Sequence, residues 1–169
     1  MGNPQNDTQD LSKIIPHYAG YECKEKRKKS DCTLRDALTE KLQYTQKALK
    51  KLNRQFKKQG KKELAEAIER IQKQLQTVTQ NLQVPAYSES EFFDRESIPK
   101  IGLNKIRDYD RAMTEQAQIL LEEVQALENL EAWDEGLDDY FNHLQDLIDG
   151  FNQNLMEREF IIASGGEDL

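Results

Sequence analysis

The sequence has few of the residues from which metal and catalytic centres are usually built. It contains two histidines, two cysteines and one tryptophan among 169 residues. No Glu-x-x-His pair occurs, which argues against the two-metal site found in some helical bundles. One face carries Asp139, His143 and Asp146 at ligand spacing, but it lies in an acidic run that indicates a solvated helix surface. The sequence therefore predicts no metal and no cofactor.

Motifs of nucleophilic and phosphate chemistry are also missing. There is no Gly-x-Ser-x-Gly elbow and no glycine-rich phosphate loop. Cys23 and Cys32 are nine residues apart, a spacing that suits neither a metal site nor neighbours on a helix. We expect both to be free thiols in a reducing compartment, and we expect the protein not to be an enzyme.

Long apolar runs are absent as well. No stretch approaches the roughly 20 apolar residues that span a bilayer, and the first ten residues resemble no secretion signal. The chain begins Met-Gly, but Asn6 stands where a myristoylation signal needs Ser or Thr. These features predict a cytoplasmic protein, with peripheral contact at the inner membrane face as the alternative.

Regularly spaced apolar residues are abundant, although only 37% of the chain is hydrophobic and 33% is charged. Steps of four and three residues are typical of helices that pack along a narrow seam, as in coiled coils. The first seam consists of Leu34, Leu38, Leu42, Thr45, Leu49, Leu52 and Phe56. The second consists of Leu64, Ile68, Ile71, Leu75, Val78 and Leu82. Gly60 lies in a short polar turn between them, which predicts an antiparallel hairpin.

The same pattern returns after residue 100 and predicts a second hairpin. We expect helices over 22–57 and 62–83, followed by a linker over 84–97 in which Phe92 and Phe93 cap the end of the bundle. A hairpin over 98–163 follows, with a turn near 129–134, where Trp133 packs. Residues 1–17 are expected to be flexible, with 11–21 either folding back or forming a weak interfacial anchor, and 164–169 to be a flexible tail. The predicted fold is an all-α, antiparallel four-helix bundle in one domain, residues 18–163.

Charge is divided unevenly along the chain. Residues 1–83 carry 18 Lys/Arg against 10 Asp/Glu, whereas residues 84–169 carry 6 against 21, within a net charge of −7. This asymmetry favours attraction between the halves or an acidic partner for the basic half. The overall acidity disfavours a dedicated nucleic-acid binder.

Two stretches of the first hairpin are candidate binding surfaces. The start of the first helix is rich in charge beyond the end of the leucine seam, which suggests that it projects from the bundle or meets a polar partner. Its candidate residues are Tyr21, Lys24, Glu25, Arg27, Lys28, Asp31 and Arg35. The second stretch is the hairpin tip, with Lys50, Lys51, Arg54, Lys57, Lys58, Lys61 and Lys62 around Phe56 and Gly60. Either stretch could equally be solvated, and the tip could also touch anionic lipid.

The first of these stretches, with the FFD and IRDYDRAM segments further on, resembles a bacterial all-helical family encoded beside band-7 (flotillin-like) genes. The residues that carry the resemblance are Gly20, Tyr21, Lys24, Glu25, Arg27 and Asp31. Lys28 departs from the family's second arginine, and the two cysteines are also departures. The resemblance implies a helical accessory protein of a membrane-associated system and no particular reaction.

Together these features predict a non-enzymatic adaptor or scaffold that binds a protein partner with an acidic surface. The alternatives are a peripheral protein that binds anionic lipid and a nucleic-acid-associated coiled coil. The first helix is longer than the second, so a second copy of the chain could cover the excess seam.

Overall fold

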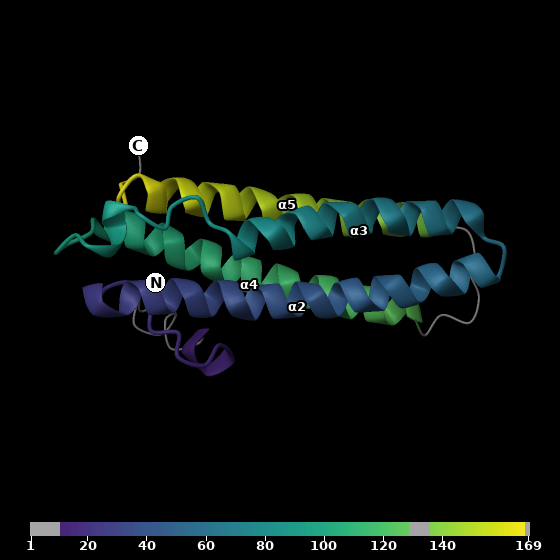
Figure 1. Cartoon of the computed structure of the whole chain (residues 1–169), viewed down its shortest axis with the longest axis horizontal. Helices are drawn as coiled ribbons and strands as arrows, with labels where there is room; N and C mark the ends of the chain where they lie inside the picture. The colour runs from purple at the N-terminus through teal and green to yellow at the C-terminus, as the bar shows by residue number, and fades with distance from the viewer. Residues whose placement is uncertain (1–10, 129–135, 168–169) are drawn as a thin grey trace.

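The computed structural model describes residues 11–128 and 136–167 and contains four long helices. These are α2 (Lys24–Lys58), α3 (Lys62–Gln83), α4 (Lys100–Glu128) and α5 (Leu137–Ala163), with a 3₁₀ turn η1 (Glu91–Phe93) in the linker. A single helical turn precedes them at residues 11–14, and neither described range contains a strand. The predicted all-α four-helix bundle is confirmed (Figure 1).

The two hairpins lie side by side and run in the same direction. Helix α2 packs against α3 and α4, and α5 packs against the same two helices. Lys41 contacts Gln118 and Lys51 contacts Glu128, so α2 and α4 are parallel neighbours. One end of the bundle therefore carries the turn between α2 and α3, the tip end, and the opposite end carries the linker and the chain's last turns, the linker end (Figure 1).

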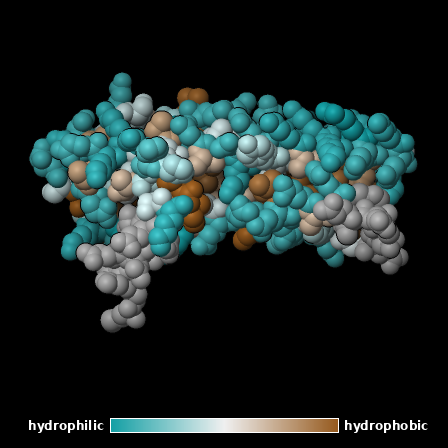
Figure 2. Space-filling view, turned by 90° about the horizontal axis from the view of Figure 1, so that it is seen from below, coloured by the Kyte–Doolittle hydropathy of each residue, from teal (hydrophilic) through white to brown (hydrophobic). Residues whose placement is uncertain are grey.

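The predicted seams form the centre of the bundle. Every residue of the first seam is buried, and so is every residue of the second except Leu64, which is partly buried. Full burial of a leucine or phenylalanine side chain contributes about 1.5–3 kcal/mol, so these stripes account for much of the stability of the fold. Figure 2 shows the complementary surface, where hydrophilic residues cover most of the visible face and hydrophobic areas are small and separate.

The segment before α2 packs onto the linker end. Leu11 and Ile15 are each 2% exposed, and Tyr18 and Tyr21 are also buried. The prediction that residues 1–17 are flexible is therefore wrong for 11–17, where folding back onto the bundle is observed; residues 1–10 lie outside the described part. Burial of a large apolar side chain contributes about 1.5–3 kcal/mol, which favours the packed arrangement of Leu11 and Ile15.

The linker and the chain's last turns close the same end. Phe92 is fully buried and Phe93 is 5% exposed, as predicted for residues that cap the bundle. The prediction of a loose tail is wrong for 164–166, because Gly165 and Gly166 are buried and the Gly165 carbonyl accepts a hydrogen bond from Arg95 Nη1 at 3.0 Å. Residues 168–169, the predicted turn at 129–134 and Trp133 within it lie outside the described residues. Among the described helices, none has the length and hydrophobicity that crossing a membrane requires.

Candidate functional site

The residues proposed as a docking surface at the start of α2 fall into two groups. Tyr21, Arg27 and Asp31 are each at most 2% exposed, so the prediction that they face a partner is corrected. The N-terminal segment and the linker cover this part of α2, so the helix neither projects nor needs a second copy of the chain to bury it. Arg27 and Asp31 are therefore charged groups inside the protein.

The other four residues of that set stay nearer to the surface. Glu25 and Lys28 are exposed, whereas Lys24 and Arg35 are partly buried. Lys24 pairs with Glu96 at 2.6 Å, and Arg35 donates to Asp31 Oδ2 at 3.0 Å and to the Leu82 carbonyl at 3.2 Å. The structure therefore does not gather the seven residues into one exposed patch.

A buried polar cluster, centred on Arg158 of α5, lies at the linker end. Arg158 is fully buried; its Nε donates to Asp110 Oδ1 at 2.5 Å and its Nη2 to Asp31 Oδ1 at 2.8 Å. Arg35 also pairs with Asp31, so two guanidinium groups face two carboxylates. Charge balance of this kind is what allows ionised side chains to remain in a protein interior.

Three tyrosines complete the cluster. Tyr18 and Tyr21 donate to Asp110 Oδ2 at 2.8 and 2.7 Å, and Tyr87 donates to Asp31 Oδ1 at 2.7 Å. Arg158 in turn donates to the hydroxyls of Tyr87 and Tyr21 at 2.9 and 2.8 Å. Burial raises the pKa of all three hydroxyls, which keeps them protonated as donors. The cluster thus joins the N-terminal segment, α2, the linker, α4 and α5.

The two carboxyl groups respond differently to burial. Burial opposes ionisation of Asp31, but attraction to Arg158 and Arg35 and hydrogen bonds from Arg158 and Tyr87 outweigh it, and the pKa of Asp31 is lowered. Burial raises the pKa of Asp110 despite the opposing attraction of Arg158. Because the polar groups of the cluster are bonded to one another, their arrangement suits a structural clamp better than a site of proton transfer.

Sequence reasoning found Asp31 but gave no role to Asp110, Arg158, Tyr18 or Tyr87. The available signal was a charged residue at an apolar seam position. Asp110 lies four residues after Ile106 and three before Met113, and Arg158 lies three residues after Leu155, so both occupy core positions of their helices. Charges at such positions predict buried partners elsewhere in the chain.

A first prediction concerns the pH dependence of Asp31→Asn. The folded-state pKa of Asp31 lies below its unfolded-state value, so its ionised form stabilises the fold above about pH 4, and this contribution is lost as pH falls through the folded-state pKa. Asp31→Asn should therefore lower the free energy of unfolding by about 1–3 kcal/mol at pH 7, and the difference from the unsubstituted protein should shrink below pH 4. Urea denaturation of both proteins between pH 2.5 and 7 measures this. The pKa of Asp110 is raised, opposite to that of Asp31, and Asp110 is present in both proteins. A difference in unfolding free energy between the two proteins that stays constant with pH would contradict the role assigned to Asp31.

The basic tip comprises Lys50, Lys51, Arg54, Lys57, Lys58, Lys61 and Lys62, the second predicted surface. All seven are exposed except Lys61, which is partly buried, and residues 41–62 contain nine Lys/Arg and no Asp/Glu. Within the described part of the chain, Lys57 pairs with Glu69 at 2.6 Å and Lys51 pairs with Glu128 at 3.1 Å, both acidic residues from beyond this stretch. The structure therefore brings these cations together at one end of the molecule.

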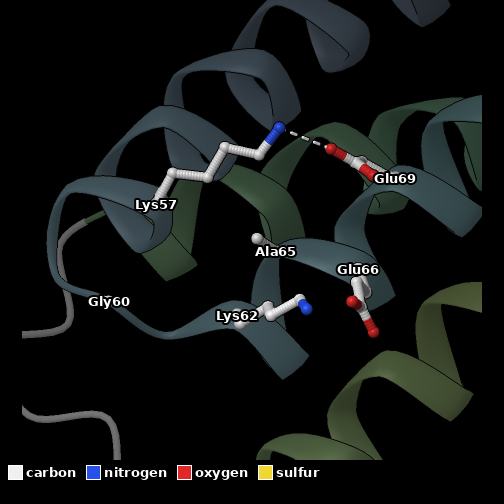
Figure 3. A pocket seen from close by; sticks show the side chains of 6 residues that line it. All are labelled: Lys57, Gly60, Lys62, Ala65, Glu66 and Glu69. Atoms are coloured by element: carbon white, nitrogen blue, oxygen red, sulfur yellow. Dashed lines mark ion pairs between the residues drawn. The ribbon is translucent and has the colours of Figure 1, made fainter.

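The turn of the hairpin leaves a shallow hollow beside these cations. It has a volume of about 310 Å³, and Figure 3 shows Lys57, Lys62, Glu66 and Glu69 around it, with Ala65 at its base. Gly60 reverses the chain at a φ of 71°, a left-handed conformation that favours glycine. Phe56, predicted to accompany the cations at the tip, is fully buried and offers no apolar contact to a partner.

No group of metal-ligating side chains occurs within residues 11–128 and 136–167. His143 lies with its Nε2 3.5 Å from Glu123 Oε1 of α4, and both side chains are partly exposed. Asp139 and Asp146 share the spacing of metal ligands with His143 in the sequence, but the three side chains do not come together as a group that could hold a metal ion.

Comparison of the chain with protein-family models, with curated proteins and with solved structures finds no significant match. The resemblance to proteins encoded beside band-7 genes therefore remains a prediction from the residues themselves, and the function has to be inferred from the geometry described above.

Proposed function

We propose that the protein is a non-enzymatic helical adaptor that binds an acidic protein partner through the basic tip. The observation that carries this proposal is the exposed set of cations at the tip, within a 22-residue stretch that has no acidic residue. Clustered exposed charge of one sign steers and orients a partner of opposite sign. The packed seam, which stays buried as far as Phe56, gives the tip a rigid base, which limits the entropy lost on binding.

The hydrophobic surface favours a protein partner over an inserted membrane contact. The large hydrophobic side chains exposed in the described residues are Ile14, Tyr44, Val84, Ile101, Ile119, Met156 and Phe160. None of them lies between residues 50 and 62. A membrane-binding helix normally combines basic residues with bulky apolar ones that enter the bilayer, and the tip presents the charges alone.

Reversal of three tip charges tests the proposal. Lys50→Glu, Arg54→Glu and Lys58→Glu alter exposed positions that form no ion pair with the described residues, so helicity should be retained. Affinity for an acidic partner should fall about tenfold or more. Lys26→Glu, Lys29→Glu and Lys73→Glu form the matched control, with the same charge change at exposed positions away from the tip. Circular dichroism checks the fold of both triple variants.

Partner class is measured with a photoreactive amino acid placed at Arg54 or, as the control position, at Lys73, in cells that make the protein. We expect a protein adduct that is specific to position 54, has an acidic cross-linked segment and disappears when Lys50 and Lys58 are reversed. An adduct with lipid or nucleic acid at position 54 would support the corresponding alternative and overturn the proposal. Equal labelling at both positions would also overturn it.

A further inference from the structure

A second cavity lies at the linker end, outside the buried polar cluster and far from the basic tip. Its volume is about 430 Å³, and it lies between the start of α2, the last part of the linker and the first turns of α4. Arg27, Lys100 and Arg107 contribute cationic groups to its lining, and Glu22 and Glu96 contribute carboxylates. The charged groups of the lining therefore carry an excess of positive charge.

Arg27 is the unusual member of this lining, because it is 1% exposed and forms no ion pair with a carboxylate of residues 11–128 or 136–167. Its Nε donates to the Tyr21 carbonyl at 2.8 Å, and its Nη1 donates to the Phe92 and Arg95 carbonyls at 3.1 and 2.6 Å. Its Nη2 makes no hydrogen bond with the described residues. Neutral carbonyls satisfy donors without cancelling the charge, and a buried cation is costly unless an anion lies close to it. Burial accordingly lowers the pKa of the Arg27 guanidinium.

The carboxylates at the cavity are already engaged by other cations. Glu96 pairs with Lys24 at 2.6 Å, and Glu22 pairs with Arg107 at 2.5 Å. Lys100, at the start of α4, forms no ion pair with any described residue, so Arg27 and Lys100 are left as two cations without a carboxylate partner. The first turn of α4 adds the partial positive charge of a helix N-terminus.

One wall of the cavity is apolar. Ile98 and Leu103 both line it and are each 8% exposed, so a ligand can cover a small hydrophobic area beside the charged groups. A pocket that combines a few convergent polar groups with apolar walls is typical of small-molecule sites.

We propose that this cavity binds a small organic anion, with its phosphate or carboxylate group held by Arg27 and Lys100 and its apolar part against Ile98 and Leu103. Guanidinium and ammonium groups form strong charge-assisted hydrogen bonds with both kinds of anion. This anion site is independent of the protein-binding surface proposed for the basic tip, which lies at the opposite end of the bundle.

Calorimetric titration with inorganic phosphate and with butyrate tests the proposal, at an ionic strength held constant with chloride. We expect saturable binding of at least one probe and a rise in Tm that follows the ligand concentration. Tighter binding of phosphate would assign a phosphate ligand, and tighter binding of butyrate a carboxylate carried on an apolar group. Absence of saturable binding of both probes would overturn the proposal.

Three variants locate the binding. Lys100→Gln should weaken binding about tenfold, because it removes one charge-assisted contact, whereas Lys28→Gln, which removes an exposed lysine that does not line this cavity, should leave binding unchanged. Glu96→Gln removes a negative charge from the lining and should tighten binding. Equal affinities of the Lys100→Gln, Lys28→Gln and unsubstituted proteins would contradict a site in this cavity. All three positions are exposed, so none of the variants should unfold the protein.

Discussion

Arg158→Ala is expected to lower the free energy of unfolding by about 3–5 kcal/mol. The substitution removes the guanidinium that holds both Asp110 and Asp31, and it leaves those buried carboxylates with only Arg35 to balance them. It also takes a hydrogen-bond donor from the hydroxyls of Tyr21 and Tyr87. Uncompensated charge in the interior costs more than the net gain that the intact pair provides, so the loss should be large.

Chemical denaturation at pH 7 measures this loss. The matched control is Arg111→Ala, which removes another arginine that pairs with an aspartate, Asp108 at 3.3 Å, but whose side chain is 41% exposed. Exposed pairs contribute only about 0.2–1 kcal/mol, so the control should stay close to the unsubstituted protein. Similar losses of unfolding free energy in both variants would show that the buried cluster contributes no more to stability than an exposed ion pair does.

Gly102→Ala is expected to destabilise the protein by about 1–3 kcal/mol, although alanine is the better helix former. Gly102 lies in the first turns of α4, and a Cβ at that position would overlap the carbonyl oxygen of Gly166. The obstacle is backbone, and Gly166 itself is confined because its own Cβ position is filled by Ile98 and Phe92. The chain's last turn would therefore have to move away from the linker end.

Gly150→Ala in α5 is the control for this prediction. A Cβ there meets only Gln116 Nε2 at 3.3 Å, the far end of a flexible side chain. The gain in helix propensity should therefore dominate and stabilise the protein by up to about 1 kcal/mol. Denaturation measures both variants, and amide hydrogen exchange at Gly165 and Gly166 should accelerate in Gly102→Ala alone. Unchanged exchange there would mean that α4 and the last turn do not depend on each other for their packing.

The charged residues at the start of α2 show what a local hydrophobicity pattern can and cannot predict. The leucine seam, extended backwards from Leu34, reaches the polar residues Asp31 and Arg27, and the absence of apolar residues there predicts exposure. Both are buried, because Tyr21 and the linker cover them and because Arg158 and backbone carbonyls satisfy them. A hydrophobicity pattern cannot distinguish a solvated charge from a buried one whose partner lies elsewhere in the chain.

The sequence alone determined the helices and the faces that they bury. Seam residues three and four apart fall on one side of an α-helix, so periodicity, with the turn at Gly60, was enough to place α3 at residues 62–83 and the start of α2 within two residues of Lys24. The tertiary structure alone decided that α2 lies beside α4 in parallel, that Arg158 meets Asp31 across 127 positions of sequence, and that Arg27 borders a cavity. Helix formation is governed by neighbours within a turn, whereas the pairing of buried charges depends on how whole helices pack, which no local pattern specifies.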